Sequence, residues 1–314
     1  NISDIEVRPS VSVSMIPDVE ELRFTTDELE AGNMFKMFDL EVSLLSNFPS
    51  GTIGSAIINI TSEATQFTSV DGATYGAQES SRWNSSVGPN STTLDLGQSR
   101  TLVTSVLGPT ETLPAAGVLN FTLTASTSLS GMVGITSPDT SSTFRVIIET
   151  VIDGELEDSP ITAGVPAVEN NATLVLTNNG NALSDYTLST SGLPGWVVSL
   201  TPNAVTALAP EVGTWPTGID SVFQNVVVTA TPPSDARADI VHEIEILLFD
   251  GEGSFVDNGT ARFVLDEVIG ALIEPDSLEI EVPSEGTQTA SFIVRNMGNS
   301  LQSFDISTGN FVGG

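Results

Sequence analysis

Carboxylates are the reactive side chains that this sequence offers in number, because 40 acidic residues stand beside 9 basic ones, a single histidine and no cysteine. Nucleophilic catalysis needs a general base next to the nucleophile. The histidine, His242, has no partner for a metal or base role, and the serines lie in Ser/Thr-rich stretches without a G-x-S-x-G elbow. A catalytic triad is therefore close to excluded, His242 is assigned no role, and we predict that the protein is not an enzyme.

Paired carboxylates of the kind that glycosidases use stay open on composition alone, since a chain this acidic always offers candidate pairs. A sugar cleft also needs aromatic side chains, and the chain has only three tryptophans and two tyrosines. One of them, Trp196, follows Leu-Pro-Gly and is expected to plug the end of a β-sandwich. The sequence thus gives no positive sign of a sugar-cleaving site.

Two acidic segments could place several oxygen atoms around Ca²⁺, a hard cation that prefers carboxylate and carbonyl ligands. The candidate ligands are Asp250, Glu252 and Asp257 in one segment and Asp153, Glu155 and Asp158 in the other. Neither segment has EF-hand spacing. The first is equally read as a solvated glycine-rich turn and the second as a charged flexible linker, so Ca²⁺ is the one cofactor that the sequence suggests.

The formal net charge of −31 restricts the partners of the protein. Nucleic acids and anionic lipids are bound through Lys and Arg, and only one of the nine basic residues, Lys36, is a lysine. We therefore exclude nucleic-acid binding. The acidity fits either a protein kept soluble in salty surroundings or one that binds calcium.

Acceptor sequons of the form N-x-S/T are slightly more frequent than the Ser/Thr-rich composition predicts, which favours a glycosylated exterior. They begin at Asn1, Asn59, Asn84, Asn90, Asn120, Asn171 and Asn258. The longest notable uncharged run, 112–138, contains prolines and glycines, so we predict strands there and no transmembrane segment in this stretch.

Alternation of apolar and polar residues predicts strands through most of the chain. In the first part Phe38, Leu40, Val42 and Leu44 should share one face of a strand. A capping-box pattern near 26–31 predicts one short helical turn. The expected fold class is all-β.

An internal repeat displaced by about 118 residues organises the domains. Asn178, Gly180, Asn181 and Leu183 recur as Asn296, Gly298, Asn299 and Leu301, and Thr150-Val-Ile upstream recurs as Glu267-Val-Ile. A repeat of this length is a whole domain and not a solenoid unit. Both glycines are expected to have positive φ angles, as a tight hairpin turn requires.

The N-G-N turn followed by G-L-P-G-W at 192–196 resembles the immunoglobulin-like domain that is appended to some alpha-galactosidases and is common in archaeal and bacterial surface proteins. The resemblance covers about a third of one repeat. It implies tandem immunoglobulin-like β-sandwich domains, which we place at 1–151, 152–270 and 271–314, the last being a partial repeat.

The partial repeat has too few strands to bury both faces of a sheet. We therefore expect 272–314 to join another copy by strand addition, or to pack on chain that follows Gly314.

Together these observations predict a non-enzymatic structural protein of a prokaryotic cell surface, specifically an archaeal one. It is expected to build an extracellular filament, stalk or S-layer by self-association. An adhesin or carbohydrate-binding module is the alternative, because it would share the fold and differ by an exposed aromatic platform. An accessory region of a glycosidase is a third reading, which rests on the resemblance.

Overall fold

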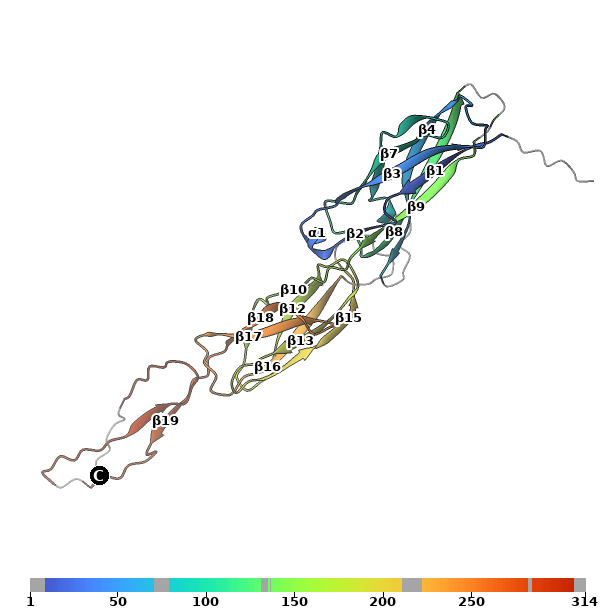
Figure 1. Cartoon of the computed structure of the whole chain (residues 1–314). Coiled ribbons are helices and arrows are strands. Elements are labelled where there is room, and N and C mark those ends of the chain that lie inside the picture. The colour runs from blue at the N-terminus through green and yellow to red at the C-terminus, as the bar shows by residue number, and fades with distance from the viewer. Residues whose placement is uncertain are drawn as a thin grey trace, which may run out of the picture. The chain divides into compact units, whose positions relative to one another are not determined.

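The protein is all-β, as predicted. A computed structural model describes residues 9–70, 79–130, 135, 137–210, 222–281 and 284–307. Within these ranges strands account for nearly all regular structure, and the described helix is one short turn (Figure 1).

The first β-sandwich consists of a four-stranded and a five-stranded sheet. The four-stranded sheet has the order β1 (Val11–Pro17), β3 (Phe35–Ser46), β7 (Ser99–Leu107), β5 (Asn84–Gly88). The five-stranded sheet has the order β2 (Glu21–Phe24), β9 (Thr140–Ile148), β8 (Gly117–Ser130), β4 (Ser55–Ser69), β6 (Ser91–Asp95). β2 runs parallel to β9, whereas the pairs β1–β3, β3–β7, β5–β7, β4–β6, β4–β8 and β8–β9 are antiparallel.

The second β-sandwich repeats this strand order. Its four-stranded sheet is β10 (Gly154–Glu157), β12 (Asn170–Asn178), β16 (Phe223–Thr231), β14 (Val197–Thr201). Its five-stranded sheet is β11 (Ile161–Gly164), β18 (Phe255–Leu265), β17 (Val241–Asp250), β13 (Ser184–Thr190), β15 (Ala204–Leu208). Each strand β1 to β9 thus has its equivalent in β10 to β18, and the parallel pair recurs as β11 with β18.

The second sandwich contains two short strands, β10 and β15, that the alternation in the sequence does not predict. β10 lies in the segment that was also read as a flexible linker, and this reading is wrong because Leu156 is buried within the sandwich. β15 was missed because it is short and follows β14 after two residues. Short strands give too few alternating positions to be recognised in isolation.

The cores are formed by the inward-facing residues of the alternating strands. On β3, Phe38, Leu40, Val42 and Leu44 are buried on one face, as predicted. Phe38 packs edge-on against Phe144 at 4.7 Å between ring centroids. Such aromatic packing adds to the stabilisation from burying apolar area.

One helical turn, α1 (Thr26–Glu30), connects β2 to β3. Its capping box begins one residue before the predicted pattern, because the N-cap is Thr25. The Thr25 N–H donates to the Glu28 carboxylate at 2.9 Å, and the Thr25 hydroxyl accepts from the Glu28 N–H. These bonds satisfy donors that the first turn of a helix leaves free.

The C-terminal region has one described sheet, in which β19 (Ala271–Glu274) pairs antiparallel with β20 (Ile293–Asn296). By sequence position they correspond to β10 and β12. Their apolar residues are exposed, with Ile273 50% and Ile293 56% accessible. A two-stranded sheet with exposed apolar residues is marginal in water by itself.

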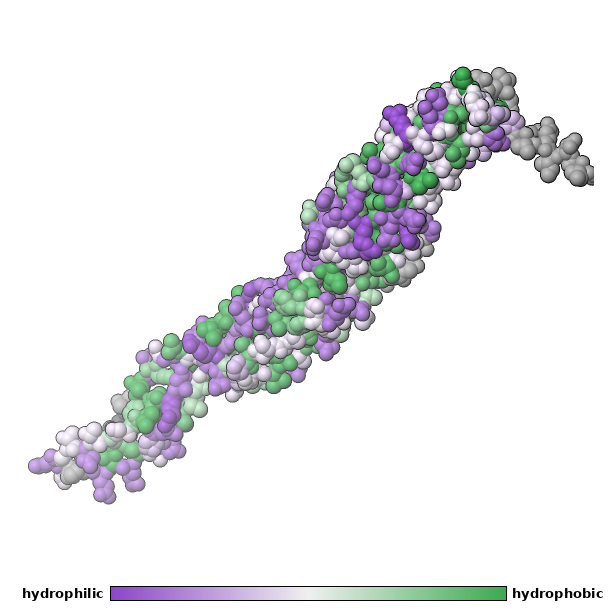
Figure 2. Space-filling model, in the orientation of Figure 1, coloured by the Kyte–Doolittle hydropathy of each residue, from purple (hydrophilic) through white to green (hydrophobic). Residues whose placement is uncertain are grey.

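The chain divides into two compact units, and the division assigns some loop residues of the second sandwich to the first unit. Unit 1 is Asn1–Asp153 with Asn178–Ser184 and Ala207–Val222, and unit 2 is Gly154–Thr177, Asp185–Thr206 and Phe223–Gly314. On the visible face hydrophilic residues are interleaved with hydrophobic ones in both units (Figure 2). No helix in the described ranges is long and apolar enough to cross a membrane.

Candidate functional site

The loop between β12 and β13 carries a fully buried asparagine, Asn181, that binds backbone groups of the first unit. Its side-chain Oδ1 accepts from the Val151 N–H at 2.7 Å. Its Nδ2 donates to the carbonyl oxygens of Pro114 and Glu149, both at 3.0 Å. Its backbone N–H donates to the Val151 carbonyl at 3.2 Å, and its carbonyl accepts from the Ala116 N–H at 2.9 Å. One residue therefore joins the segment after β9 to the 114–116 loop.

The equivalent asparagine in unit 2, Asn299, makes the same five hydrogen bonds. Its Oδ1 accepts from the Val268 N–H at 2.7 Å, and its Nδ2 donates to the carbonyls of Asp266 at 3.0 Å and Ala236 at 3.1 Å. Its N–H donates to the Val268 carbonyl and its carbonyl accepts from the Ala238 N–H. The repeat read from the sequence thus extends to individual hydrogen bonds.

A third asparagine, Asn47, makes the central part of this arrangement in the first sandwich. It directly follows β3, the equivalent of β12 and β20. The Ser10 N–H donates to Asn47 Oδ1 at 2.6 Å, and the Asn47 N–H donates to the Ser10 carbonyl at 3.3 Å. We call Asn47, Asn181 and Asn299 the linker-binding asparagines, because each pairs reciprocally with a backbone residue shortly before the first strand of its repeat.

The glycines that precede two of these asparagines permit close contact between backbones. A Cβ atom on Gly180 would lie 2.4 Å from the Val151 carbonyl oxygen, and one on Gly298 would lie 2.2 Å from that of Val268. Neither glycine has a positive φ angle, so the prediction of positive φ at both is wrong. Glycine is required here because the linker passes too close for a side chain, and not because of the turn conformation.

A second asparagine in each turn holds the loop in shape. Asn178 accepts from the Gly180 N–H at 3.0 Å and donates to the Ala182 carbonyl. Asn296 accepts from the Gly298 N–H at 2.8 Å and donates to the Ser300 carbonyl. Such local side-chain bonds replace the hydrogen bonds of a regular turn. The linker-binding asparagine is thereby presented in the same position in both repeats.

An ion pair with a fully buried glutamate supports the loop that Asn181 binds, and no sequence motif predicts it. Glu79 is fully buried, pairs with Arg82 at 2.8 Å and accepts from Trp83 Nε1–H at 3.4 Å. Arg82 donates to the carbonyl oxygen of Thr112 at 3.2 Å and to that of Leu113 at 3.5 Å, directly before Pro114. A buried charge pair with further hydrogen bonds of this kind fixes local geometry more than it adds stability.

The side-chain amides of the linker-binding asparagines are suited to a structural role. A primary amide offers one acceptor oxygen and two N–H donors, and it neither titrates nor acts as a nucleophile at neutral pH. Buried backbone groups that stay unpaired are costly, so an amide that satisfies three of them stabilises the linker in one conformation. This arrangement recognises the backbone of its own chain.

The sequence showed that Asn181 and Asn299 recur but not what they bind. Val151 also recurs as Val268, so the sequence shows that both partners of the asparagine–valine contact repeat. Their partners in the 114–116 and 236–238 loops have no matching sequence pattern, because they contribute only backbone atoms.

The first candidate calcium segment forms a hairpin turn stabilised by its own aspartate. Asp250 Oδ1 accepts from the N–H groups of Glu252 at 2.9 Å and Ser254 at 2.8 Å. Asp257 Oδ2 accepts from the Leu156 N–H at 2.9 Å. The described ranges contain no group of three or more His, Cys, Asp or Glu side chains that could hold a metal ion.

The second candidate segment is distributed over a loop and β10. The Asp153 carbonyl accepts from the N–H groups of Asn179 and Gly180. Asp158 Oδ1 accepts from the Thr260 N–H at 2.8 Å and its Oδ2 pairs with Arg262 at 2.7 Å. Burial raises the pKa of the Asp158 carboxyl, but these two donors outweigh burial and hold the pKa below its usual value. Glu155 lies on β10. Calcium binding therefore stays a prediction from the sequence.

Six of the seven sequon asparagines lie in the described ranges, and Asn1 lies outside them. Asn120 is half-buried on β8. The exposed ones are Asn59, Asn84, Asn90, Asn171 and Asn258. Asn171 accepts from the Thr229 hydroxyl at 2.7 Å, and Asn258 donates to the Glu245 carboxylate at 3.1 Å.

The described tryptophans form no exposed platform of the kind that a carbohydrate-binding module uses. Trp83 is 4% exposed and packs edge-on against Phe24. Trp196 is half-buried and contacts His242 and Phe263. Trp215 lies outside the described residues. His242 Nε2 is 2.7 Å from the Arg237 carbonyl oxygen, a contact that gives it no catalytic partner.

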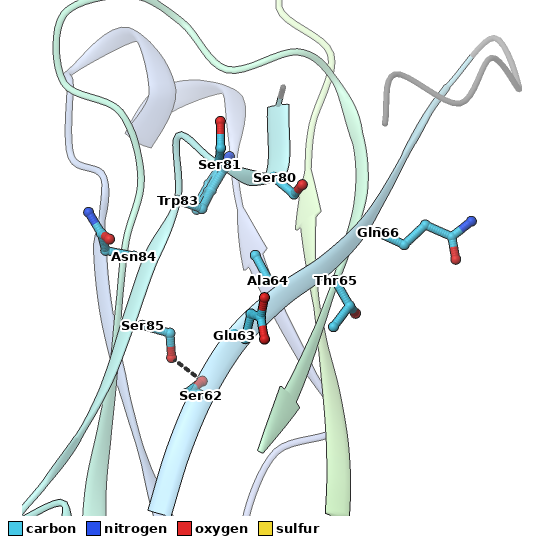
Figure 3. A pocket seen from close by; sticks show the side chains of 10 residues that line it. All are labelled: Ser62, Glu63, Ala64, Thr65, Gln66, Ser80, Ser81, Trp83, Asn84 and Ser85. Carbon is cyan, nitrogen blue, oxygen red and sulfur yellow. Dashed lines mark hydrogen bonds between the residues drawn. The ribbon is translucent and has the colours of Figure 1, made fainter. Parts of the chain in front are cut away.

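A hollow of about 600 Å³ in unit 1 is bounded by β4, β5 and the segment before β5 (Figure 3). It is lined by Ser62, Glu63, Ala64, Thr65, Gln66, Ser80, Ser81, Trp83, Asn84 and Ser85. Across it the hydroxyls of Ser62 and Ser85 lie 2.6 Å apart. Among the described residues of this lining Glu63 is the one titratable side chain, so these residues supply no pair of catalytic groups.

No protein-family model matches the sequence, and no curated protein matches it. Three solved structures are similar to the chain at low sequence identity. The D00-D0 domain of intimin has 11% identity and a TM-score of 0.31, covering 81% of this chain and 99% of that one. The CsuC–CsuE chaperone–tip adhesion subunit complex of Csu pili from Acinetobacter baumannii has 10% identity and a TM-score of 0.32, covering 69% and 93%.

A third similar structure is that of domains 4 and 5 of the S-layer protein SbsC, with 12% identity and a TM-score of 0.23, covering 45% of this chain and 64% of that one. TM-scores this low do not establish a shared function. The function of the chain is therefore argued from its own residues.

Proposed function

We propose that the chain is a non-enzymatic structural protein of a prokaryotic, archaeal cell surface, in which tandem acidic immunoglobulin-like sandwiches build a filament, a stalk or an S-layer. The observation that carries the proposal is the recurrence of five hydrogen bonds at Asn181 and Asn299, with the central reciprocal pair again at Asn47. A protein that holds its domains in series needs the same hydrogen-bonding arrangement to be repeated at successive linkers.

The linker segments 149–151 and 266–268 are bound by these asparagines and are not free tethers. A typical hydrogen bond contributes about 0.5–1.5 kcal/mol net, so the five bonds at one asparagine stabilise a linker by a few kcal/mol. A protein under mechanical or crystalline constraint benefits from such linkers, whereas an enzyme gains nothing from them.

The charge supports an exterior location. The formal net charge of the chain is −31, because only nine basic residues stand against 40 acidic ones. Self-repulsion of this size is tolerated where salt screens it over about 8–10 Å. The exposed sequons agree with the same location.

Self-association through 272–314 is part of the proposal. In the described ranges β20 has one strand neighbour, whereas its equivalents β3 and β12 each have two. The uncovered apolar side chains include Leu272, Phe292, Ile293 and Leu301. An edge with exposed apolar residues recruits another strand, and strand addition joins the subunits of many protein fibres.

Electron microscopy of the native material tests the proposal. Filaments, sheets or rods with repeated density are expected, and isolated compact particles would contradict it. Deleting 272–314 should abolish the assembly while the two complete sandwiches stay folded by circular dichroism and calorimetry. Normal assembly of the deletion variant would exclude strand addition through this segment.

A further inference from the structure

An exposed apolar row crosses the outer face of the four-stranded sheet in the first sandwich and ends at a sequon. Phe35 on β3 is paired with Leu107 on β7, and Leu107 is paired with Asn84 on the edge strand β5. Directly opposite residues on neighbouring strands point to the same face with Cβ atoms about 4.5–5.5 Å apart. Phe35 is 49% and Leu107 43% exposed, and Asn84 is exposed as well.

The row continues into a wider apolar patch on the same face. Met37 and Val103, two and four residues along β3 and β7 from the row, are 61% and 45% exposed. Ser105 lies between Val103 and Leu107 on the same face, and the alternating residues Thr104 and Val106 are fully buried. Phe35 and Leu107 are thus neighbouring exposed apolar side chains on this face, a pair that an adjacent group could cover.

The first sugar of a glycan on Asn84 would be the nearest group able to cover Phe35 and Leu107. Asn84-Ser-Ser is an acceptor sequon, and Asn84 lies on an edge strand with its side chain exposed. A pyranose ring has an apolar C–H face that packs on aromatic and aliphatic side chains. Its hydroxyl groups stay free to bind polar groups.

A polar hollow beside Asn84 supplies partners for those hydroxyls. It measures about 370 Å³ and is lined by Arg82, Asn84, Leu107, Gly108, Pro109, Thr110, Glu111 and Thr112. Asn84 and Leu107 belong both to the hollow and to the apolar row. The surroundings of Asn84 therefore combine an apolar platform with hydroxyl, carboxylate and guanidinium groups.

We propose that Asn84 carries an N-linked glycan whose first sugar packs on Leu107 and Phe35 and covers the apolar patch. The proposal rests on the extracellular location proposed above, because a chain must pass the glycosylation machinery to be modified. The glycan would then be part of the folded surface, and it would keep a hydrophobic face of the sheet from associating with other molecules.

Asn171 provides a matched control in the second sandwich. It is an exposed sequon asparagine on β12, and its row across the sheet consists of Thr229 on β16 and Ser199 on β14. A glycan on Asn171 therefore has hydroxyl groups beside it and no apolar platform. The two sites differ in the property that the proposal needs.

The experiment is a thermodynamic cycle on the full chain, produced in a host that N-glycosylates secreted proteins. Mass spectrometry of peptides measures occupancy at Asn84 and Asn171. Asn84→Gln and Asn171→Gln are each made in the natural sequence and in a Phe35→Thr background, which keeps a β-branched residue on the half-exposed strand. Calorimetry measures the melting temperature of the sandwich that carries the substituted sequon, which is the first for Asn84 and the second for Asn171.

Asn84→Gln should lower this melting temperature by about 2–4 °C in the natural sequence and by less than about 1 °C in the Phe35→Thr background. Asn171→Gln should have the same effect in both. An unoccupied Asn84 beside an occupied Asn171, or equal effects of Asn84→Gln in both backgrounds, overturns the proposal. Leu107→Thr repeats the cycle if Phe35→Thr does not fold. None of these results depends on assembly, so they separate this proposal from the structural function.

Discussion

Replacing Asn181 by alanine should destabilise the first unit substantially, although the residue lies in a loop between β12 and β13. The substitution removes the acceptor for the Val151 N–H and the donor for the carbonyls of Pro114 and Glu149. The backbone bonds of residue 181 itself stay, because alanine retains both groups. The Asn181 side chain is fully buried, so water does not readily replace it.

The expected loss can be worked from these three bonds. A buried donor left unpaired costs about 1–3 kcal/mol, and a carbonyl with two lone pairs costs less. We therefore expect a loss of about 3 kcal/mol in the free energy of unfolding. For a unit of this size that corresponds to a melting temperature lower by about 6–12 °C.

Differential scanning calorimetry of the full chain is the assay, because it resolves the transitions of separate units where a single two-state fit does not apply. Asn299→Ala should lower the transition of unit 2 by a similar amount. Asn203→Ala, at an exposed loop position between β14 and β15, should change either transition by no more than about 0.5 kcal/mol. A loss below this value for Asn181→Ala would refute the role assigned to the linker-binding asparagines.

Three further outcomes are expected. Gly180→Ala should lower the free energy of unfolding, measured in urea, by about 2 kcal/mol or more, because the new Cβ would lie 2.4 Å from the Val151 carbonyl oxygen. Gly251→Ala, whose Cβ would lie 3.3 Å from its nearest atom, should lower it less, and equal losses would contradict the close contact at Gly180. Because the pKa of Asp158 is lowered in the folded protein, its carboxylate stabilises the fold above the ordinary pKa of about 4, and this stabilisation is lost as the pH falls below that value. Asp158→Asn should therefore weaken the pH dependence of the free energy of unfolding between about pH 4 and 2, and an unchanged dependence would refute the role of Asp158. The calcium sites predicted from the sequence should make calcium raise the melting temperature more than magnesium does at equal ionic strength; an equal rise would exclude them.

The fold class and the repeat were predictable because both depend on patterns within the sequence. Alternation along β3 placed Phe38 to Leu44 on the correct face, and the 118-residue displacement identified equivalent loops. Short strands such as β10 and β15 were missed, because four or five residues carry little alternation.

The chemistry of the candidate site was less predictable, because most of its partners are backbone atoms. The sequence shows an asparagine but not the carbonyls and N–H groups that it meets. Gly180 and Gly298 were recognised as constrained positions for the wrong reason, since close approach and positive φ both select glycine. The sequence also does not show that the carboxylates of Asp250 and Asp257 accept from backbone N–H groups.

Hydrogen–deuterium exchange of the backbone amides at Val151 and Val268 tests most directly that the linkers are bound and not free. Both N–H groups donate to a linker-binding asparagine, so we predict exchange as slow as that of core strand amides such as Val106, and fast exchange at Val151 in Asn181→Ala with Val268 unchanged. Exchange of both amides at the rate of an exposed loop in the natural protein would contradict the account.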